Sequence, residues 1–181
     1  MKPNQVFHFL VALVALIGAC GTQERSRTQG RSHISPRETV ELTLNGKKIF
    51  ITYGRPYMKG RKIMGGLVPY NKVWRTGADE ATRLATEADL VIGNLAVPKG
   101  SYSIFTLPSE SGWKMILNKV DKQWGAFRYD EKQDLGRADM KVGKTSDPVE
   151  QFTITLAKSG NGGVIKLEWE NTSVSVDFQV R

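Results

Sequence analysis

The side chains best suited to chemistry are four cations, three aromatic residues and one carboxylate between positions 55 and 80. They are Arg55, Lys59, Arg61, Arg75, Tyr57, Tyr70, Trp74 and Glu80. A guanidinium group holds a carboxylate, phosphate or sulfate through two parallel hydrogen bonds. An aromatic face can stack on the apolar face of a sugar. The combination predicts a binding site for an anionic or carbohydrate ligand, formed by Arg55, Lys59, Arg61, Trp74, Arg75 and Glu80.

A purely structural interpretation of the same segment competes with the ligand site. In that interpretation Trp74 belongs to the core, Arg75 pairs with Glu80 or Asp79, and the glycines only let the loop turn. The two interpretations differ in one observable respect. A binding site requires the cations to converge on an open cleft, whereas a structural role requires a closed ion pair beneath other side chains.

Imidazole and thiol chemistry is excluded from the folded part of the chain. The two histidines are His8 and His33 and the single cysteine is Cys20, all before the predicted domain of residues 37–181. Without these groups there is no Ser-His-Asp or Cys-His machinery and none of the usual zinc or copper ligand sets. The sequence also lacks a phosphate-binding P-loop and a dinucleotide fingerprint. We therefore expect no cofactor and no metal site.

A hydrolase that uses two carboxylates is the alternative function. Glycosidases place two such groups roughly 5–10 Å apart across the substrate. Asp79 and Glu80 are adjacent and would point to opposite faces of an extended segment, so Glu80 would need an acid from far along the chain. The acidic run at residues 121–134 is interleaved with Lys and Arg, which is typical of a solvated loop rather than a calcium site. A non-catalytic binding module is favoured over this hydrolase and over a structural protein without a small-molecule site.

Strands must position these side chains, because no segment keeps a helical period over three turns. Apolar and polar residues alternate in "VSVDFQV" (174–180) and "IKLEWE" (165–170), and Asn171 to Ser173 between them predict a hairpin. "VELTL" and "KIFITY" flank Asn45-Gly46, the pair best suited to a two-residue type I′ turn. Six shorter candidates lie between these hairpins, so nine or ten strands predict an all-β fold, a jelly-roll-like antiparallel β-sandwich. A closed β-barrel is the alternative. We expect Trp113, Trp124 and Trp169 to be buried.

The first residues predict export and lipid attachment. "VFHFLVALVALIG" is too short for the ~20 residues that span a bilayer, and "LIGAC" is similar to the lipobox in which the chain is cut before an acylated cysteine. This predicts a lipoprotein signal peptide at 1–19, a membrane partner through acylated Cys20, and a polar tether at 20–36. Gly21 after the cysteine favours the outer membrane of the cell envelope. The net charge of +8 gives a basic surface, but an exported lipoprotein is not expected to meet nucleic acid.

The segment "YGRPYMKGRKIMGGLVPYNKVWRTGADEAT" resembles the opening of a family of exported bacterial domains, domain-of-unknown-function family 2911. The matching positions are Arg55, Pro56, Lys59, Gly60, Arg61, Trp74, Arg75, Gly77, Glu80 and Thr82. Asp79 stands where the family pattern often has Asn. "VPKGSYSIFTLP" and "NKVDKQWGAFRYD" also resemble family segments, and the resemblance covers roughly residues 38–180. It implies a β-rich domain in the cell envelope and supplies no activity.

Overall fold

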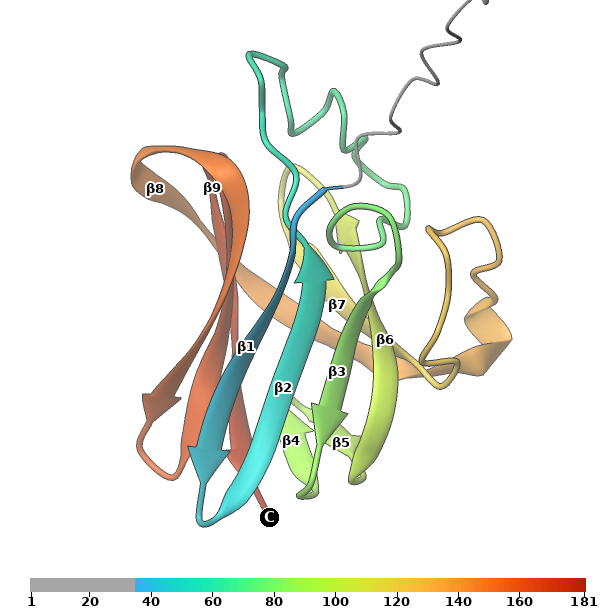
Figure 1. Cartoon of the computed structure of the whole chain (residues 1–181), viewed down its shortest axis with the longest axis vertical. Coiled ribbons are helices and arrows are strands. Elements are labelled where there is room, and N and C mark those ends of the chain that lie inside the picture. Colours follow the sequence, from blue (N-terminus) through green and yellow to red (C-terminus); the bar gives the residue numbers. More distant parts are fainter. Residues whose placement is uncertain (1–34) are drawn as a thin grey trace, which may run out of the picture. The chain divides into compact units, whose positions relative to one another are not determined.

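The computed structural model describes residues 35–181, and antiparallel strands make up most of this part (Figure 1). The elements are β1 (Arg37–Leu44), β2 (Lys47–Gly54), β3 (Thr82–Thr86), β4 (Leu90–Ile92), β5 (Leu95–Val97), β6 (Gly100–Pro108), β7 (Trp113–Asn118), the 3-10 turn η1 (Glu131–Gln133), β8 (Asp134–Ser159) and β9 (Gly162–Val180). The predicted signal peptide and the tether as far as residue 34 lie outside the described residues.

The strands form one nine-stranded sheet in the order β1-β2-β3-β6-β7-β8-β9-β4-β5. The sheet folds over on itself along β8, which pairs with β7 over its first residues and with β9 from Lys141 onward. Two layers result, and they confirm the expected antiparallel β-sandwich. Most connections join neighbouring strands, while the β4–β5 hairpin crosses to lie beside β9. The order ends at β1 and β5, so the sheet is open and the alternative of a closed barrel is wrong.

The hairpin of β1 and β2 confirms the prediction made from Asn45-Gly46. Leu44 pairs with Lys47, and both turn residues have positive φ, 51° for Asn45 and 73° for Gly46. A type I′ turn needs this conformation at both positions, and Asn-Gly adopts it at low cost.

The hairpin predicted for Asn171 to Ser173 is wrong, because the chain does not reverse there. Both flanking segments belong to the single strand β9, and Thr172 and Ser173 pair with Lys144 and Gly143 of β8. The ladder is irregular where Glu170 takes a φ of 56°, so the strand bends instead of turning back. The local preference of these residues for a turn is therefore overridden by pairing with β8, a strand of 26 residues that forms hydrogen bonds with their backbone groups.

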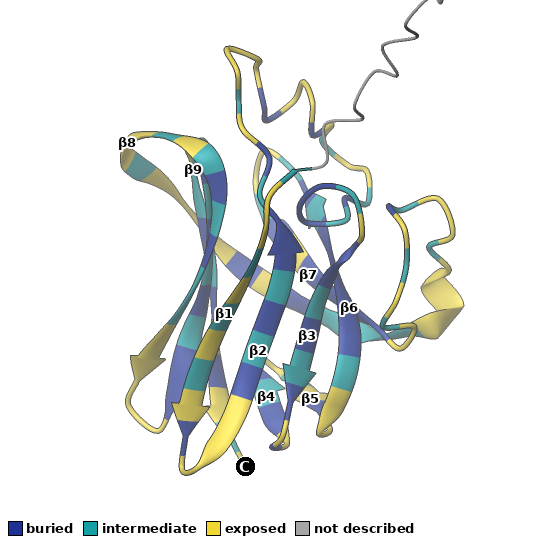
Figure 2. Cartoon of the chain, viewed as in Figure 1, coloured by how far each residue is buried: buried dark blue, intermediate teal, exposed yellow. Residues whose placement is uncertain are grey.

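The core lies between the two layers, as the alternation of buried and intermediate positions along β2 illustrates (Figure 2). Ile49, Ile51 and Tyr53 of β2 have no exposed surface. The Tyr53 hydroxyl accepts a hydrogen bond from the Ile154 backbone N–H of β8 at 2.9 Å, which ties the layers together. Trp113 and Trp169 are buried, as expected.

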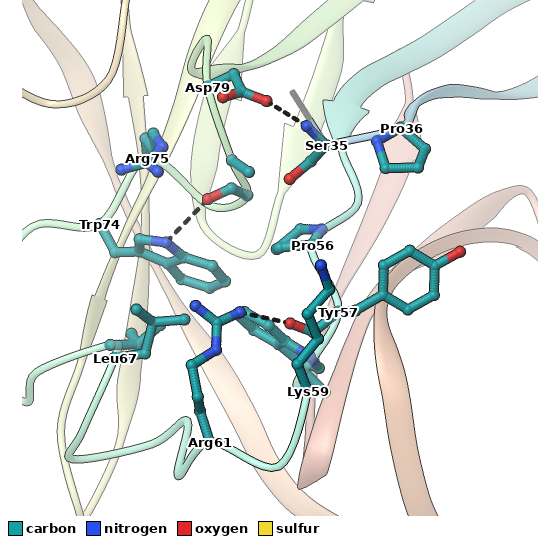
Figure 3. A pocket seen from close by; sticks show the side chains of 14 residues that line it. Ser35, Pro36, Pro56, Tyr57, Lys59, Arg61, Leu67, Trp74, Arg75 and Asp79 are labelled. Atoms are coloured by element: carbon teal, nitrogen blue, oxygen red, sulfur yellow. Dashed lines mark hydrogen bonds between the residues drawn. The ribbon is translucent and has the colours of Figure 1, made fainter. Parts of the chain in front are cut away.

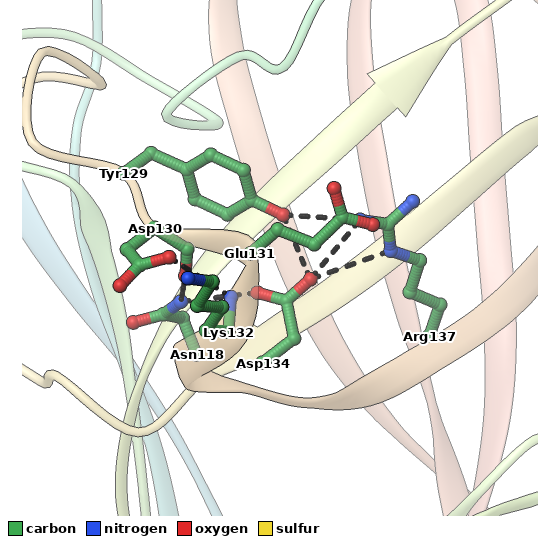
Figure 4. A network of polar contacts seen from close by, with 7 residues as sticks. All are labelled: Asn118, Tyr129, Asp130, Glu131, Lys132, Asp134 and Arg137. Carbon is green, nitrogen blue, oxygen red and sulfur yellow. Dashed lines mark hydrogen bonds and ion pairs between the residues drawn. The ribbon is translucent and has the colours of Figure 1, made fainter.

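A polar network anchors the loop of residues 119–133 between β7 and β8 (Figure 4). Buried Asn118 donates from Nδ2 to the Asp130 carbonyl and to Asp134 Oδ1, both at 3.0 Å. The Tyr129 hydroxyl donates to Asp134 Oδ2 at 2.7 Å, and Arg137 donates to the same carboxylate. Because both ends of the loop bond to one buried amide, its backbone is held against the sheet.

This network predicts a loss of stability at alkaline pH. Burial, followed by the hydrogen bond to Asp134, raises the pKa of Tyr129 from 10.0 to about 12. Above pH 10 the unfolded chain releases a proton that the folded chain retains, so the free energy of unfolding falls as the pH rises from about 10 to 12. We expect Tyr129→Phe to make this decline shallower when the free energy of unfolding is measured by urea titration at several pH values.

Part of the decline should remain in this variant, because burial also raises the pKa values of Tyr53 and Tyr102. Tyr57→Phe, at a phenol outside the network, is the matched control, and equal slopes in all three proteins would contradict the assignment.

Candidate functional site

The loop of residues 55–81, which joins β2 to β3, is held in place by β8 and β9. The backbone N–H groups of Met58 and Lys59 donate to the carbonyl and the carboxylate of Glu150, at 2.8 and 2.9 Å. Those of Ile63 and Met64 donate to the Glu170 carboxylate at 3.3 and 3.2 Å. The loop contains no named β-strand, and hydrogen bonds to Glu150 and Glu170 of the opposite layer hold its backbone in place instead.

Four non-glycine residues of this loop have left-handed backbone conformations. The φ values are 50° for Lys59, 59° for Asn71, 58° for Thr76 and 63° for Asp79. The conformation is most costly for a β-branched residue such as Thr76, and such strain is of order 1–3 kcal/mol. Thr76 is fully buried, its hydroxyl donates to the Trp74 carbonyl at 3.3 Å, and its carbonyl accepts from the Thr82 hydroxyl. The surroundings thus enforce a strained geometry, as they often do at ligand sites.

The loop surrounds a pocket of about 670 Å³ at one end of the sandwich (Figure 3). The pocket is lined by Ser35, Pro36, Pro56, Tyr57, Lys59, Arg61, Leu67, Val68, Trp74, Arg75, Gly77, Ala78, Asp79 and Trp169. Four of the six residues predicted to bind a ligand are therefore brought together here, namely Lys59, Arg61, Trp74 and Arg75.

The three cations of the pocket form no ion pair with an acidic residue of the described chain. Among the ion pairs within residues 35–181, none includes Lys59, Arg61 or Arg75. Arg61 is oriented by backbone carbonyls instead, donating from Nε to Met58 at 2.9 Å and from Nη2 to Tyr57 at 2.6 Å. These bonds leave the other guanidinium N–H groups of Arg61 available to a ligand.

Arg75 is the least satisfied of the three cations. Its Nε atom is buried and has no hydrogen-bond partner within the described chain. Burial lowers the pKa of the Arg75 guanidinium, and the nearby charge of Asp79 acts in the opposite direction. A buried, unpaired donor of this kind costs about 1–3 kcal/mol, so an anion that reached it would recover interaction energy that the free protein lacks.

Asp79 is held by the chain itself. Among the described lining residues it alone carries a carboxylate, and its Oδ2 accepts a hydrogen bond from the Ser35 backbone N–H at 2.9 Å (Figure 3). The three cations thus face one carboxylate, and the pocket has a net positive charge.

Trp74 belongs to both the core and the pocket. Its Nε1 donates to the Gly77 carbonyl at 3.2 Å, and its ring stacks on that of Trp169 at a centroid distance of 6.0 Å. Only 9% of Trp74 and 2% of Trp169 are exposed. With so little indole surface available, the pocket offers an apolar floor for a small ligand rather than an open platform for a sugar ring.

Arg55 and Glu80, the other two predicted binding residues, lie outside the pocket lining. Arg55 donates to the Phe152 carbonyl at 3.1 Å and to Thr153 Oγ1 at 2.9 Å, and it pairs with Glu38. Glu80 pairs with Arg37 at 2.7 Å. The structural interpretation paired Arg75 with Glu80 or with Asp79. Glu80 pairs with Arg37 instead, and Asp79 affects Arg75 as a nearby charge without forming an ion pair within the described residues.

Sequence reasoning missed several pocket residues and misplaced one tryptophan. Tyr57 and Leu67 lie on the same loop as the predicted residues but were not predicted to bind, while Ser35 and Trp169 join the lining from distant parts of the chain that no local pattern connects to the loop. The expectation that Trp124 is buried is wrong, because 60% of it is exposed. Trp124 lies on the loop of residues 119–133, outside both layers of the sheet.

Two further observations concern the described part of the chain. Within residues 35–181, no three His, Cys, Asp or Glu side chains are grouped so that they could hold a metal ion. The same part of the chain contains no helix with the length and hydrophobicity needed to span a membrane.

Fold and pocket define the class of protein, an antiparallel β-sandwich with a cationic pocket at one end. Residues 35–178 match the model of a family described as "Protein of unknown function (DUF2911)", and the chain belongs to this family. The match confirms the resemblance seen in the sequence. Neither a curated protein nor a solved structure matches the chain.

Proposed function

We propose that the domain is a binding module for a small organic anion, such as a carboxylate, a phosphate or an acidic sugar. The observation that carries this proposal is that Lys59, Arg61 and Arg75 line one pocket and form no ion pair within residues 35–181. Cations that form no ion pair attract an anion. The half-buried Arg75 should do so most strongly, because water screens its charge less than it screens the exposed Lys59 and Arg61. The strained, hydrogen-bonded loop supports the proposal, since a pre-organised site loses little entropy on binding.

The carboxylate-based hydrolase is the weaker proposal for this pocket. Hydrolysis by two acids needs a pair of carboxyl groups across the substrate, whereas Asp79 is the one carboxylate among the described lining residues and already accepts the Ser35 N–H. Binding without catalysis requires nothing beyond the cations and the apolar floor.

Titration of the full chain with matched charged and neutral sugars tests the proposal. We expect glucuronate to bind and glucose not to bind in calorimetric titrations, because the two differ in the carboxylate that the cations would hold. Inorganic phosphate and sulfate should compete, and the affinity should fall as sodium chloride is raised. Equal binding of glucose and glucuronate, or failure of all three anions to bind, would refute the anion site.

We also propose that the protein is attached to the cell envelope through acylated Cys20, with the outer membrane as its destination. The lipobox-like "LIGAC" and the absence of any other cysteine support this proposal. Intact mass spectrometry of the protein purified from membranes should show a chain that begins at Cys20 and carries acyl groups. Cys20→Ala should abolish both the cleavage and the added mass, and an unmodified thiol in the wild-type protein would contradict the proposal.

A further inference from the structure

The loop of residues 119–133, named here the aromatic loop, exposes an unusual amount of apolar surface. Phe127 is 86% exposed, Trp124 60% and Val120 43%. An isolated exposed apolar residue is common, but three on one loop mark an interaction surface. None of the three lines the cationic pocket, so the loop calls for a separate explanation.

The exposure is built into the fold. Ala126 and Tyr129, from the same loop, pack against buried Phe105 and Ile116 on the outer face of the sheet. Asn118 and the Tyr129–Asp134–Arg137 network fix both ends of the loop (Figure 4). Half of the loop is thus anchored while Trp124 and Phe127 face outward, which indicates that the two rings are presented to a partner.

The charges around the rings favour an anionic partner. The exposed cations of the loop are Lys119, Lys122, Arg128 and Lys132. Within the described residues none of them takes part in an ion pair, whereas Asp121 pairs with Arg83, and Glu131 and Asp134 pair with Arg137. Asp130 is the remaining carboxylate, and it caps η1 by accepting the Lys132 N–H at 3.0 Å. The loop that carries the two exposed rings therefore also carries four exposed cations that form no ion pair within residues 35–181.

We propose that the aromatic loop docks the domain on an anionic lipid surface, with Phe127 and Trp124 inserted at the level of the headgroups. Both rings gain by leaving water in this zone, and the indole N–H of tryptophan can stay hydrated there. Flanking Lys and Arg side chains extend to the lipid phosphates. Acylation of Cys20 is not required, since an acyl chain would tether the protein but leave these rings in water.

Fluorescence quenching by lipids brominated in the acyl chain tests the proposal on the full chain. Trp74, Trp113 and Trp169 are buried, so quenching by the bilayer reports on Trp124. With phosphatidylglycerol vesicles we expect quenching that Trp124→Phe removes and that Trp113→Phe leaves in place. Phosphatidylcholine vesicles should quench less, because they lack the negative charge.

Two variants of the aromatic loop measure the docked fraction. Phe127→Ser should lower the ratio of docked to undocked protein about tenfold or more, from the lost ring burial. Arg128→Gln should lower it about fivefold on phosphatidylglycerol, since each basic side chain near such a surface contributes on the order of 1 kcal/mol. The matched controls are Val142→Ser, at another exposed apolar residue, and Lys158→Gln, at an exposed cation of β8; both should leave quenching unchanged.

Three results would overturn the proposal. The first is vesicle quenching that does not depend on Trp124. The second is a Trp124 emission change with neutral oligosaccharides such as cellohexaose but not with vesicles, which would make the loop a sugar platform. The third is a dimer in solution that Phe127→Ser dissociates without any effect on vesicle quenching.

Discussion

Arg75→Ala is expected to weaken glucuronate or phosphate binding about tenfold or more, because a hydrogen bond to a charged group contributes on the order of 1.5–3 kcal/mol. The fold should remain intact. Arg75 makes no ion pair within the described chain and its buried Nε has no partner, so its removal eliminates a desolvated donor rather than a stabilising contact. We expect the melting temperature of the variant to equal or exceed that of the wild type, as occurs when a residue is kept for function at a cost in stability.

Charge-matched variants distinguish specific binding of the anion by Arg75 from nonspecific attraction by the net positive charge of the protein. Arg128→Gln removes the same charge from the aromatic loop and should leave soluble-anion binding within about twofold, because Arg128 is exposed to salt and does not line the pocket. Arg75→Lys should restore only part of the affinity, since an ammonium group cannot form the planar pair of hydrogen bonds. Calorimetric affinity and thermal melting should be read together. A melting temperature several degrees lower in Arg75→Ala, with unchanged anion binding, would instead assign a structural role to this residue.

Gly54→Ala is expected to cause the largest loss of stability among the variants considered. Gly54 ends β2 at the point where the 74–80 segment packs on it, and an added Cβ would lie well under 3.0 Å from the Ala78 carbonyl oxygen. The atoms nearest to the added Cβ are all backbone atoms of Ala78, so no flexible side chain can move to make room. Overpacking of this kind costs about 3 kcal/mol, and for a domain of this size the melting temperature should fall by on the order of 10 °C.

The same substitution should also disturb the pocket, because Gly77, Ala78 and Asp79 line it and must move away from β2. Gly112→Ala is the matched control, since a Cβ there meets nothing within 4 Å. Its effect should stay within about 0.5 kcal/mol. Thermal melting by circular dichroism and anion titration of both variants check the expectation. A Gly54→Ala protein that melts and binds like Gly112→Ala would show that the 74–80 segment is not packed against β2.

Much of the fold could be predicted because it depends on local sequence patterns, namely alternating side chains in strands and turn residues between them. Alternating side chains in β2 and β9 indicated strands with one buried face, and Asn45-Gly46 specified the hairpin between β1 and β2. The positions of His8, His33 and Cys20 also placed imidazole and thiol groups before the folded domain without any structural information. These properties depend on residue type and on spacings of one or two positions, which a sequence displays directly.

The composition of the pocket could be predicted only in part. The segment that contains Lys59, Arg61, Trp74 and Arg75 was identified from its residue types, but Arg55 and Glu80 within it point to other partners. Arg55 lies where β2 meets β8, and Glu38 with Thr153 occupies its guanidinium. Neighbours in an extended chain face opposite ways, so proximity in sequence does not decide which cations share a cavity.

The sequence by itself thus determined the class of fold, the kinds of chemistry open to the domain and the segment that carries its cations. The tertiary structure decided which cations stay unpaired, that Asn171 to Ser173 continue a strand, and that Trp124 faces solvent. The physical reason is that pairing and burial depend on partners far along the chain. Glu80 forms its ion pair with Arg37 rather than with Arg75. The backbone of Asn171 to Ser173 pairs with β8 and therefore does not turn. Asn118 anchors the aromatic loop through a hydrogen bond to Asp130, outside the core.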